Sequence, residues 1–336
     1  MKGIVIAGTV LVDNVKIIEA YPSPTMLTTI VSESKAVGGV VSNTSITLKR
    51  IDPSLDVRVL GLIGDDSFGD YIKKVFNEEK LDISLLKVSN VYKTAYTDVM
   101  TELNGRRTFF VNKGCNSYLD EAYFDALNGE NTMLCHIGYL LLLDALDQKD
   151  EEYGTKMARL LHSLQKRNIK TSIDLVSEES HRFKDVVLPS LKYCDYVIIN
   201  EIEAGRIFDI PPRDEKGNII INSIKEILKL LKKSGVKEKA IIHCPELGAL
   251  INENDEITIV PSLLLPKSFI KGTVGAGDAF CAGALLGIVK KYSDDEILKI
   301  ASCTAAINLT AIDSISAGVS LKETLELLKN YERKKI

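Results

Sequence analysis

The sequence predicts an α/β fold: a doubly wound, mostly parallel sheet with helices on both faces and a small β-sheet lid. Three observations predict it. Short apolar runs alternate with amphipathic helical patterns along most of the 336 residues. The apolar runs are nearly continuous, as in strands that are buried on both faces. Two segments instead alternate polar and apolar residues, which indicates strands with one exposed face.

The main sheet is predicted from short apolar runs that are rich in Val and Ile. They are residues 3–8, 56–64, 132–138, 169–175, 196–200, 239–244 and 256–261. Helices are predicted where apolar residues recur with helical spacing, at residues 41–51, 67–79, 149–168, 201–208, 223–234, 278–291, 294–310 and 320–332. Apolar strands separated by helices favour a parallel sheet that helices cover on both faces.

The two alternating segments are residues 10–37 and 90–113, and we expect them to form one small sheet that projects as a lid. The second segment carries Asn104 and Gly105, a pair typical of a tight hairpin turn. The core domain then comprises residues 1–9, 38–89 and 114–336. An ordinary edge hairpin is the alternative to a lid.

The composition argues against nucleic-acid and membrane partners. The net charge is −4, and no basic amphipathic segment is present. Asp13 interrupts the N-terminal apolar run, which is too short for a signal peptide or a membrane span. Six scattered cysteines without a C-x-x-C pair indicate reduced thiols and a cytoplasmic location. The pairs Cys135–His136 and His243–Cys244 do not predict shared metal sites, because neighbouring strand residues face opposite sides.

One stretch, KGTVGAGDAF at residues 271–280, combines glycines and an acid at the start of a predicted helix. Its glycines permit unusual backbone angles and let a ligand approach the main chain closely. The unpaired amides and the positive dipole end of a helix N-terminus favour an anion such as phosphate. Asp278 would repel that anion, unless it accepts a proton from the group that attacks the phosphate. An acid that merely complements the helix dipole is the alternative.

Other motifs narrow the class of enzyme. No G-x-x-x-x-G-K-[ST] occurs, which excludes a P-loop, and no G-x-G-x-x-G follows the first strand, which disfavours a dehydrogenase. Asp13 instead lies just beyond the first strand, at the sheet edge where open α/β folds bind ligands. Gly38 and Gly39 expose main-chain amides before a helix, and Asn43 can donate to and accept from sugar hydroxyls. The alternative is a flexible turn at the glycines, with Ser42 or Asn43 as the helix cap.

Together these motifs resemble those of the ribokinase-like (PfkB) family of carbohydrate and nucleoside kinases, over essentially the full length. Four signatures match in order: G-G-x-x-x-N at Gly38–Asn43, G-D-D-x-x-G at Gly64–Gly69, N-x-x-E at Asn200–Glu203 and T-x-G-A-G-D-x-F at Thr273–Phe280. The resemblance implies the ribokinase-like fold, with ATP as phosphoryl donor and Mg²⁺ as cofactor.

The resemblance also implies roles for the matching residues. Asp278 is expected to be the base that deprotonates the acceptor hydroxyl, beside an anion hole formed by Gly275, Ala276 and Gly277. Asn200 and Glu203 are expected to organise Mg²⁺ through its waters. Thr273 and Gly248 are expected to contact the nucleotide. The residues expected to hold the sugar are Asp13, Gly38, Gly39, Asn43 and Asn116.

The chain also departs from the family pattern. Gly272 stands where cation-activated members carry an Asp, so we expect little dependence on potassium. Val176 stands where an Asn is common, and Pro245 replaces part of the two-glycine turn to which Gly248 belongs. The segment after residues 132–138 lacks the acidic residue of ribose-specific members, so ribose is not the first expectation.

The sequence therefore predicts an ATP-dependent sugar kinase that transfers the γ-phosphoryl group to a hydroxyl of a small carbohydrate. A nucleoside kinase of the same family is the first alternative, since Tyr92 and Tyr96 could stack on a base. A non-catalytic sugar-binding or regulatory protein on the same fold is the second. A homodimer through the lid is expected as well, because such pairing is common among relatives and covers exposed strand edges.

Overall fold

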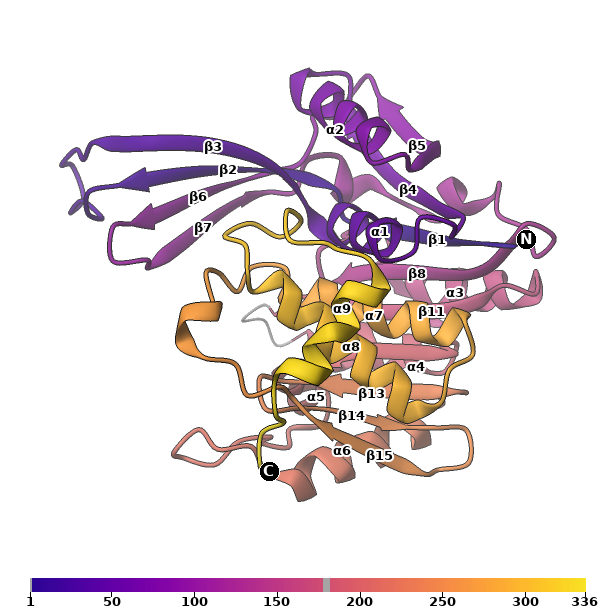
Figure 1. Cartoon of the computed structure of the whole chain (residues 1–336). Coiled ribbons are helices and arrows are strands. Elements are labelled where there is room, and N and C mark those ends of the chain that lie inside the picture. The colour runs from indigo at the N-terminus through magenta and orange to yellow at the C-terminus, as the bar shows by residue number, and fades with distance from the viewer. Residues whose placement is uncertain (1, 178–181) are drawn as a thin grey trace.

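The main sheet has nine strands, and all its neighbours pair in parallel except at one edge. The computed structural model describes residues 2–177 and 182–336. The strands are β1 (Gly3–Gly8), β4 (Val57–Gly64), β5 (Asp82–Ser89), β8 (Thr132–Leu140), β11 (Lys170–Leu175), β12 (Tyr196–Asn200), β13 (Lys239–His243), β14 (Leu247–Ile251) and β15 (Ile257–Pro261). Their order is β15-β14-β13-β12-β11-β8-β1-β4-β5, with antiparallel pairing only at β13–β14 and β14–β15 (Figure 1).

Helices cover both faces of this sheet, as the sequence predicts. One face carries α1 (Gly39–Ile51), α2 (Ser67–Glu78), α7 (Ala276–Val289) and α8 (Asp294–Asn308), with α9 (Leu321–Asn330) packed against α8. The other face carries α3 (Lys156–Lys166), α4 (Phe183–Leu191), α5 (Glu201–Phe208) and α6 (Ile221–Lys233). Along β1, Ile4 and Ile6 enter the first core while Val5 and Ala7 enter the second. This burial on both sides explains the continuous apolar runs, and the predicted α/β fold class is confirmed.

A separate four-stranded sheet extends away from the core (Figure 1). Its strands are β2 (Leu11–Ile18), β3 (Ile30–Gly38), β6 (Tyr96–Glu102) and β7 (Arg107–Asn112), in the order β3-β2-β6-β7. The β6–β7 turn contains Asn104 and Gly105, and Gly105 has a φ of 88°. The strands therefore come from the two segments with alternating patterns, apart from Gly38 at the end of β3.

Several predicted boundaries differ from the structure. The helix expected over 149–168 begins at Lys156, because β9 (Lys149–Asp150) pairs with β10 (Gly154–Thr155) and Thr155 caps α3. Sequence patterns missed α4, whose interior Pro189 is typical of a helix end rather than a helix. They also missed β5 and β14. The remaining elements are the 3-10 helices η1 (Gly114–Tyr118), η2 (Glu121–Phe124) and η3 (Lys267–Phe269).

Among the helices that the structure describes, none combines the length and the apolar character that a membrane crossing requires.

Asp66 ties the second strand insertion to the core. Its carboxylate caps α2 by accepting from the amides of Phe68 and Gly69, and it also accepts from the amide and hydroxyl of Thr94. Burial opposes ionisation of this carboxylate, but these hydrogen bonds outweigh burial and hold the pKa of Asp66 below its usual range. Asp66, within the G-D-D-x-x-G signature, is therefore the cap of α2, and it also fixes the start of the segment that leads to β6.

Replacement of this cap gives a direct stability test. We expect Asp66→Ala to lower the free energy of unfolding by about 2–4 kcal/mol, since it removes a helix cap and leaves the Thr94 donors unpaired. The loss should diminish under acid, because a carboxylate with a lowered folded pKa stabilises the fold only above that pKa. Urea unfolding at pH 7 measures the change.

Asp65→Ala is the matched control, since Asp65 is exposed and adjacent to Asp66. It should change stability by less than about 0.5 kcal/mol. Equal effects of the two substitutions would contradict the role given to Asp66.

Candidate active site

The start of α7 presents main-chain amides rather than a side-chain cap. Gly275 is the cap residue with a φ of 77°, and an added Cβ would lie 2.5 Å from Cβ of Ser314. The first full hydrogen bond of the helix runs from the Ala279 amide to the Gly275 carbonyl at 2.8 Å. The amides of Gly277 and Asp278 precede that bond and lie at the positive end of the helix dipole. This geometry suits an anion.

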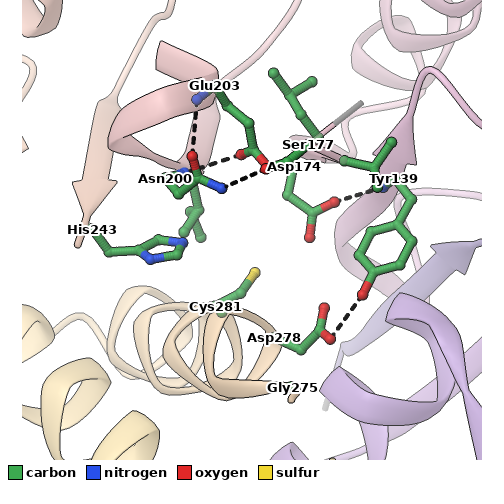
Figure 2. Close-up of a pocket in the computed structure, with 13 residues that line it drawn as sticks. Tyr139, Asp174, Ser177, Asn200, Glu203, His243, Gly275, Asp278 and Cys281 are labelled. Carbon is green, nitrogen blue, oxygen red and sulfur yellow. Dashed lines mark hydrogen bonds between the residues drawn. The ribbon is translucent and has the colours of Figure 1, made fainter. Parts of the chain in front are cut away.

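Asp278 is buried at this helix start and is held by two donors from distant elements. The Asn43 side-chain nitrogen, from α1, donates to Asp278 Oδ2 at 2.8 Å, and the Tyr139 hydroxyl, at the end of β8, donates to the same oxygen at 2.9 Å (Figure 2). Burial, and then the nearby carboxylate of Asp174, raise the pKa of Asp278 to about 7, although the two hydrogen bonds oppose the rise. Oδ1 is thus the oxygen that can accept from a substrate.

A cavity of about 200 Å³ opens above Asp278 at the carboxyl ends of β8, β11, β12 and β13. Three carboxylates, Asp174, Glu203 and Asp278, line it together with Asn200 and His243 (Figure 2). Among its lining residues in the described part of the chain, none is a lysine or an arginine. The cavity therefore favours a cation or a ligand that brings one.

Asn200 and Glu203 meet in a capping box at the start of α5. The Asn200 side chain accepts from the Glu203 amide at 2.8 Å, and Glu203 accepts from the Asn200 amide at 3.0 Å. The Ser177 hydroxyl adds a hydrogen bond to Glu203 at 2.8 Å. Burial raises the pKa of Glu203 to about 8 despite these donors. Glu203 therefore acts as an ordinary capping carboxylate at the start of α5. The side chains of Asn200 and Glu203 also line the cavity.

The oxygen-rich cavity fits a magnesium ion. Mg²⁺ prefers carboxylate and water oxygens and keeps several of its waters. Glu203 supplies a carboxylate and Asn200 an amide to the lining of the cavity, and none of its described lining residues is a lysine or an arginine. These residues would hold the ion if it is bound.

A larger cavity of about 570 Å³ adjoins the first, and the two share Asn200, His243 and Gly277. Its lining is mostly apolar and includes Leu263, Leu265, Ile270, Phe280, Ala305, Ala306 and Leu309. His243 stacks on Phe280 with ring centroids 4.7 Å apart. Burial lowers the pKa of His243 to about 4, so the ring is neutral at physiological pH. An apolar pocket of this size beside an anion site suits a nucleotide base.

The predicted nucleotide contacts are only partly brought together. Thr273 and Ala276 line the larger cavity. Gly248 lines neither cavity: it is buried in β14, and an added Cβ would lie 3.0 Å from the Phe280 ring. Gly248 therefore permits close packing of the sheet against α7, and its contact with the nucleotide stays a prediction.

The predicted sugar-binding residues divide into two groups. Asp13, on β2, lies against Gly38, where an added Cβ would collide with its carboxylate. Burial raises the pKa of Asp13 to about 6, although a hydrogen bond with the Thr97 side chain opposes the rise. Gly39 has a φ of 82°, and an added Cβ would lie 2.5 Å from the Thr9 carbonyl. These glycines let the end of the small sheet approach the start of α1.

Asn43 and Asn116 are engaged with protein atoms instead. Asn43 donates to Asp278 and accepts from the Ser314 hydroxyl at 2.8 Å. The alternative of Asn43 as a helix cap is wrong, since α1 is capped by Gly38. Asn116 bonds the amide and carbonyl of Val10 through both of its polar atoms. Asn43 thus joins the catalytic candidate, and Asn116 fixes the segment between β1 and β2.

Tyr139 is the main residue that sequence patterns missed. It has a φ of 62°, uncommon for a bulky side chain, and its amide donates to Asp174 at 2.6 Å while its hydroxyl donates to Asp278. Two carboxylates therefore hold it in place (Figure 2). Its only sequence signal was its place at the carboxyl end of a strand.

The tyrosines considered for base stacking have protein partners. Tyr92 stacks on Tyr118 with ring centroids 3.4 Å apart, and Tyr96 packs against Phe68 at 5.7 Å. Because each ring packs against another aromatic side chain, Tyr92 and Tyr96 do not face each other across a space for a base. The idea that Tyr92 and Tyr96 together bind a nucleoside is not supported by their placement.

Comparison with known proteins identifies the family. The family model "pfkB family carbohydrate kinase" matches residues 1–319. The chain belongs to the PfkB family of carbohydrate kinases. This PfkB protein is therefore a phosphotransferase that acts on a hydroxyl group of a sugar or a nucleoside.

Individual relatives span nearly the whole PfkB chain at low identity. A ribokinase from Haemophilus influenzae is 20% identical, covering 98% of this chain and 99% of its own. A nucleoside kinase from Methanocaldococcus jannaschii is 22% identical, covering 93% of this chain and 91% of its own. The structure of Arabidopsis thaliana ribokinase complexed with ribose and ATP superposes with a TM-score of 0.79 at 18% identity, over 98% of this chain and 99% of that one. These similarities establish the ribokinase-like fold.

The buried acid gives a stability prediction of its own. The folded pKa of Asp278 is raised, so its protonated form favours the fold, and this benefit is lost as pH rises toward about 7. We expect Asp278→Asn to raise the melting temperature at pH 8, and the gain to shrink as pH falls from 7 to 5. Differential scanning calorimetry of both proteins at each pH measures this, and a gain independent of pH would count against a buried, protonatable Asp278.

Proposed function

We propose that the protein is an ATP-dependent sugar kinase that transfers the γ-phosphoryl group of ATP to a hydroxyl of a small carbohydrate. One observation carries the proposal: a buried carboxylate, whose pKa burial raises to about 7, lies in the first turn of α7 next to main-chain amides that precede the bond from Ala279 to Gly275. Base and anion site thus share one short segment, as transfer to a hydroxyl requires.

In the proposed reaction, Asp278 takes the proton of the acceptor hydroxyl as that oxygen bonds to phosphorus and the bond to the departing ADP oxygen breaks. A pKa near 7 suits a general base at physiological pH. The segment of Gly275, Ala276 and Gly277 is the proposed anion hole, in which the Gly277 amide, followed by that of Asp278, would stabilise charge on the equatorial oxygens of the phosphoryl group; the Ala276 amide donates to the Thr273 carbonyl at 3.4 Å. Tyr139 and Asn43 hold the carboxylate in place through Oδ2 and leave Oδ1 for the hydroxyl.

The nucleotide is proposed to lie across the two cavities. The apolar cavity next to Phe280 and Leu263 would take the adenine, and Thr273 and Ala276 lie on its route to the helix start. Asn200 and Glu203 would hold Mg²⁺ through its waters. The ion would supply charge neutralisation of the triphosphate.

Asp13, Gly38 and Gly39 are the proposed contacts for the sugar, and the small sheet is the proposed lid. Support comes from connectivity: β2 carries Asp13 and β3 runs into Gly38, so movement of the sheet would carry both residues. Asp13 is close enough to Tyr139 to contribute to the raised pKa of its hydroxyl, and that hydroxyl donates to Asp278. The proposed sugar contact and the proposed base are therefore neighbours. Closure of residues 10–37 and 90–113 would exclude water and limit hydrolysis of ATP.

A screen of ATP consumption tests the function. Purified protein is assayed with sugars, sugar phosphates and nucleosides, and Asp278→Asn is assayed beside it with the best substrate. We expect a sugar to be phosphorylated, and the variant to lose about 10²- to 10⁴-fold in turnover. The wild-type kcat/KM should fall as pH drops through about 7, because Asp278 must be ionised to act.

Each outcome of the screen decides a specific point. A nucleoside as the best substrate would favour the nucleoside kinase alternative, which the M. jannaschii relative supports. Near-normal turnover in folded Asp278→Asn would remove that residue as the base. Background rates with every compound, while one compound still raised the melting temperature, would favour a sugar-binding protein.

We also expect kinase activity to be independent of potassium. An added Cβ on Gly272 would lie 2.5 Å from the Ala311 carbonyl, so this position has no room for the Asp of cation-activated members. Rates in potassium chloride and sodium chloride at equal ionic strength should match. Strong stimulation by potassium alone would show that another set of oxygens forms the site.

A further inference from the structure

Three buried side chains of different chemistry converge beneath the smaller cavity. His136 lies on β8, Asp174 on β11 and Cys281 on α7, and all three are buried. One ligand atom from each lies within 4.8 Å of the others. The Cys281 sulfur and the Asp174 carboxylate point toward the same space (Figure 2). No role in phosphoryl transfer requires a thiol or an imidazole at this place.

Two of the three separations among these atoms match those of ligands around a tetrahedral zinc ion, and the third is within 4.8 Å. Zn–N and Zn–O bonds of about 2.0 Å and a Zn–S bond of about 2.3 Å place N and O about 3.3 Å apart, and N and S about 3.5 Å apart. In the structure, Nε2 of His136 lies 3.3 Å from Oδ2 of Asp174 and 3.5 Å from Sγ of Cys281. Both contacts therefore have metal-ligand spacing.

The contacts of the cluster leave one atom of each side chain facing the other two. Nε2 of His136 makes long contacts, of 3.3 Å with the Asp174 carboxylate and of 3.5 Å with the Cys281 thiol, whose S–H can itself donate. Nδ1 of His136 lies 2.9 Å from the Ser172 hydroxyl, and Oδ1 of Asp174 accepts from the Tyr139 amide at 2.6 Å. When Nδ1 donates to Ser172, the Nε2 lone pair is directed at the shared centre. Outer partners of this kind orient metal ligands.

We propose that His136, Asp174 and Cys281 form a zinc site in the floor of the cavity. The thiolate and the carboxylate balance the two charges of the ion, and a buried ion needs such compensation. Since Asp174 and Cys281 also line the cavity, the fourth position faces it and takes a water or an oxygen of a bound ligand. The thiolate selects zinc over magnesium, which prefers oxygen ligands. The proposal goes beyond the kinase function and does not depend on it.

The two faces of β8 explain why this site escaped the sequence. Cys135 belongs to the core on the opposite face of the sheet from His136 and cannot share a ligand set with it. The sulfur that meets His136 is Cys281, which is 145 residues away along the chain. The contact between His136 and Cys281 therefore depends on how α7 packs on the sheet.

Metal binding without nucleotide or sugar tests the proposal. Reduced, chelator-treated protein is titrated with Co²⁺ in excess Mg²⁺, and then with Zn²⁺. We expect one Co²⁺ per chain, a thiolate-to-cobalt charge-transfer band with tetrahedral visible bands, and displacement by Zn²⁺. Failure to bind one ion per chain, or a cobalt spectrum without the thiolate band, overturns the proposal whether or not the kinase is active.

Two single-residue variants test whether Cys281 supplies the thiolate ligand. Cys281→Ser keeps the size of the side chain, and it should abolish the charge-transfer band and weaken Zn²⁺ binding by about 100-fold or more, since loss of an outer partner alone costs about 10- to 100-fold. Cys244→Ser is the control, because Cys244 is the more accessible thiol outside the cluster. The control should keep the band. A band lost in Cys244→Ser and kept in Cys281→Ser overturns the site, and the wild-type spectrum remains decisive if Cys281→Ser does not fold.

Discussion

The site depends on a buried carboxylate that, within the described residues, receives its side-chain hydrogen bonds from uncharged donors. Asp278 is taken out of water at the start of α7, and the groups that compensate it are neutral donors, Asn43 and Tyr139. Such donors offset only part of the desolvation, so the carboxyl keeps a raised pKa and a high affinity for protons. The fold holds this proposed base in place at a cost in stability that the rest of the core offsets.

The fold satisfies this constraint by bringing together elements that are far apart in the chain. The donor from α1 lies 235 residues before Asp278, and Ser314 in turn holds that donor from the other side. The carboxyl ends of four parallel strands supply the walls of the cavity, so their polar ends face one space while their apolar middles fill two cores. Parallel pairing thus collects the polar groups at one edge.

Local motifs could be predicted from the sequence, and long-range partnerships could not. Gly38, Gly39 and Gly275 could be singled out from the sequence, because each stands where the backbone turns sharply or packs too closely for a side chain. Asn43 was assigned to the sugar, yet its amide is directed at Asp278, a contact that no spacing reveals. Tyr139 was missed because its orientation depends on a positive φ that two distant carboxylates stabilise. The role of Gly248 could not be decided from the sequence, because a glycine needed for packing against Phe280 resembles one needed for a ligand.

The most direct measurement of the central claim is the ionisation of Asp278 itself. Infrared difference spectra between wild type and Asp278→Asn isolate the protonated carboxyl stretch of this one residue as pH is varied. A protonated carboxyl that persists at pH 6 and titrates near pH 7 is the predicted result. A carboxyl already ionised at pH 5, as for an exposed aspartate, would contradict a base buried and poised by the fold.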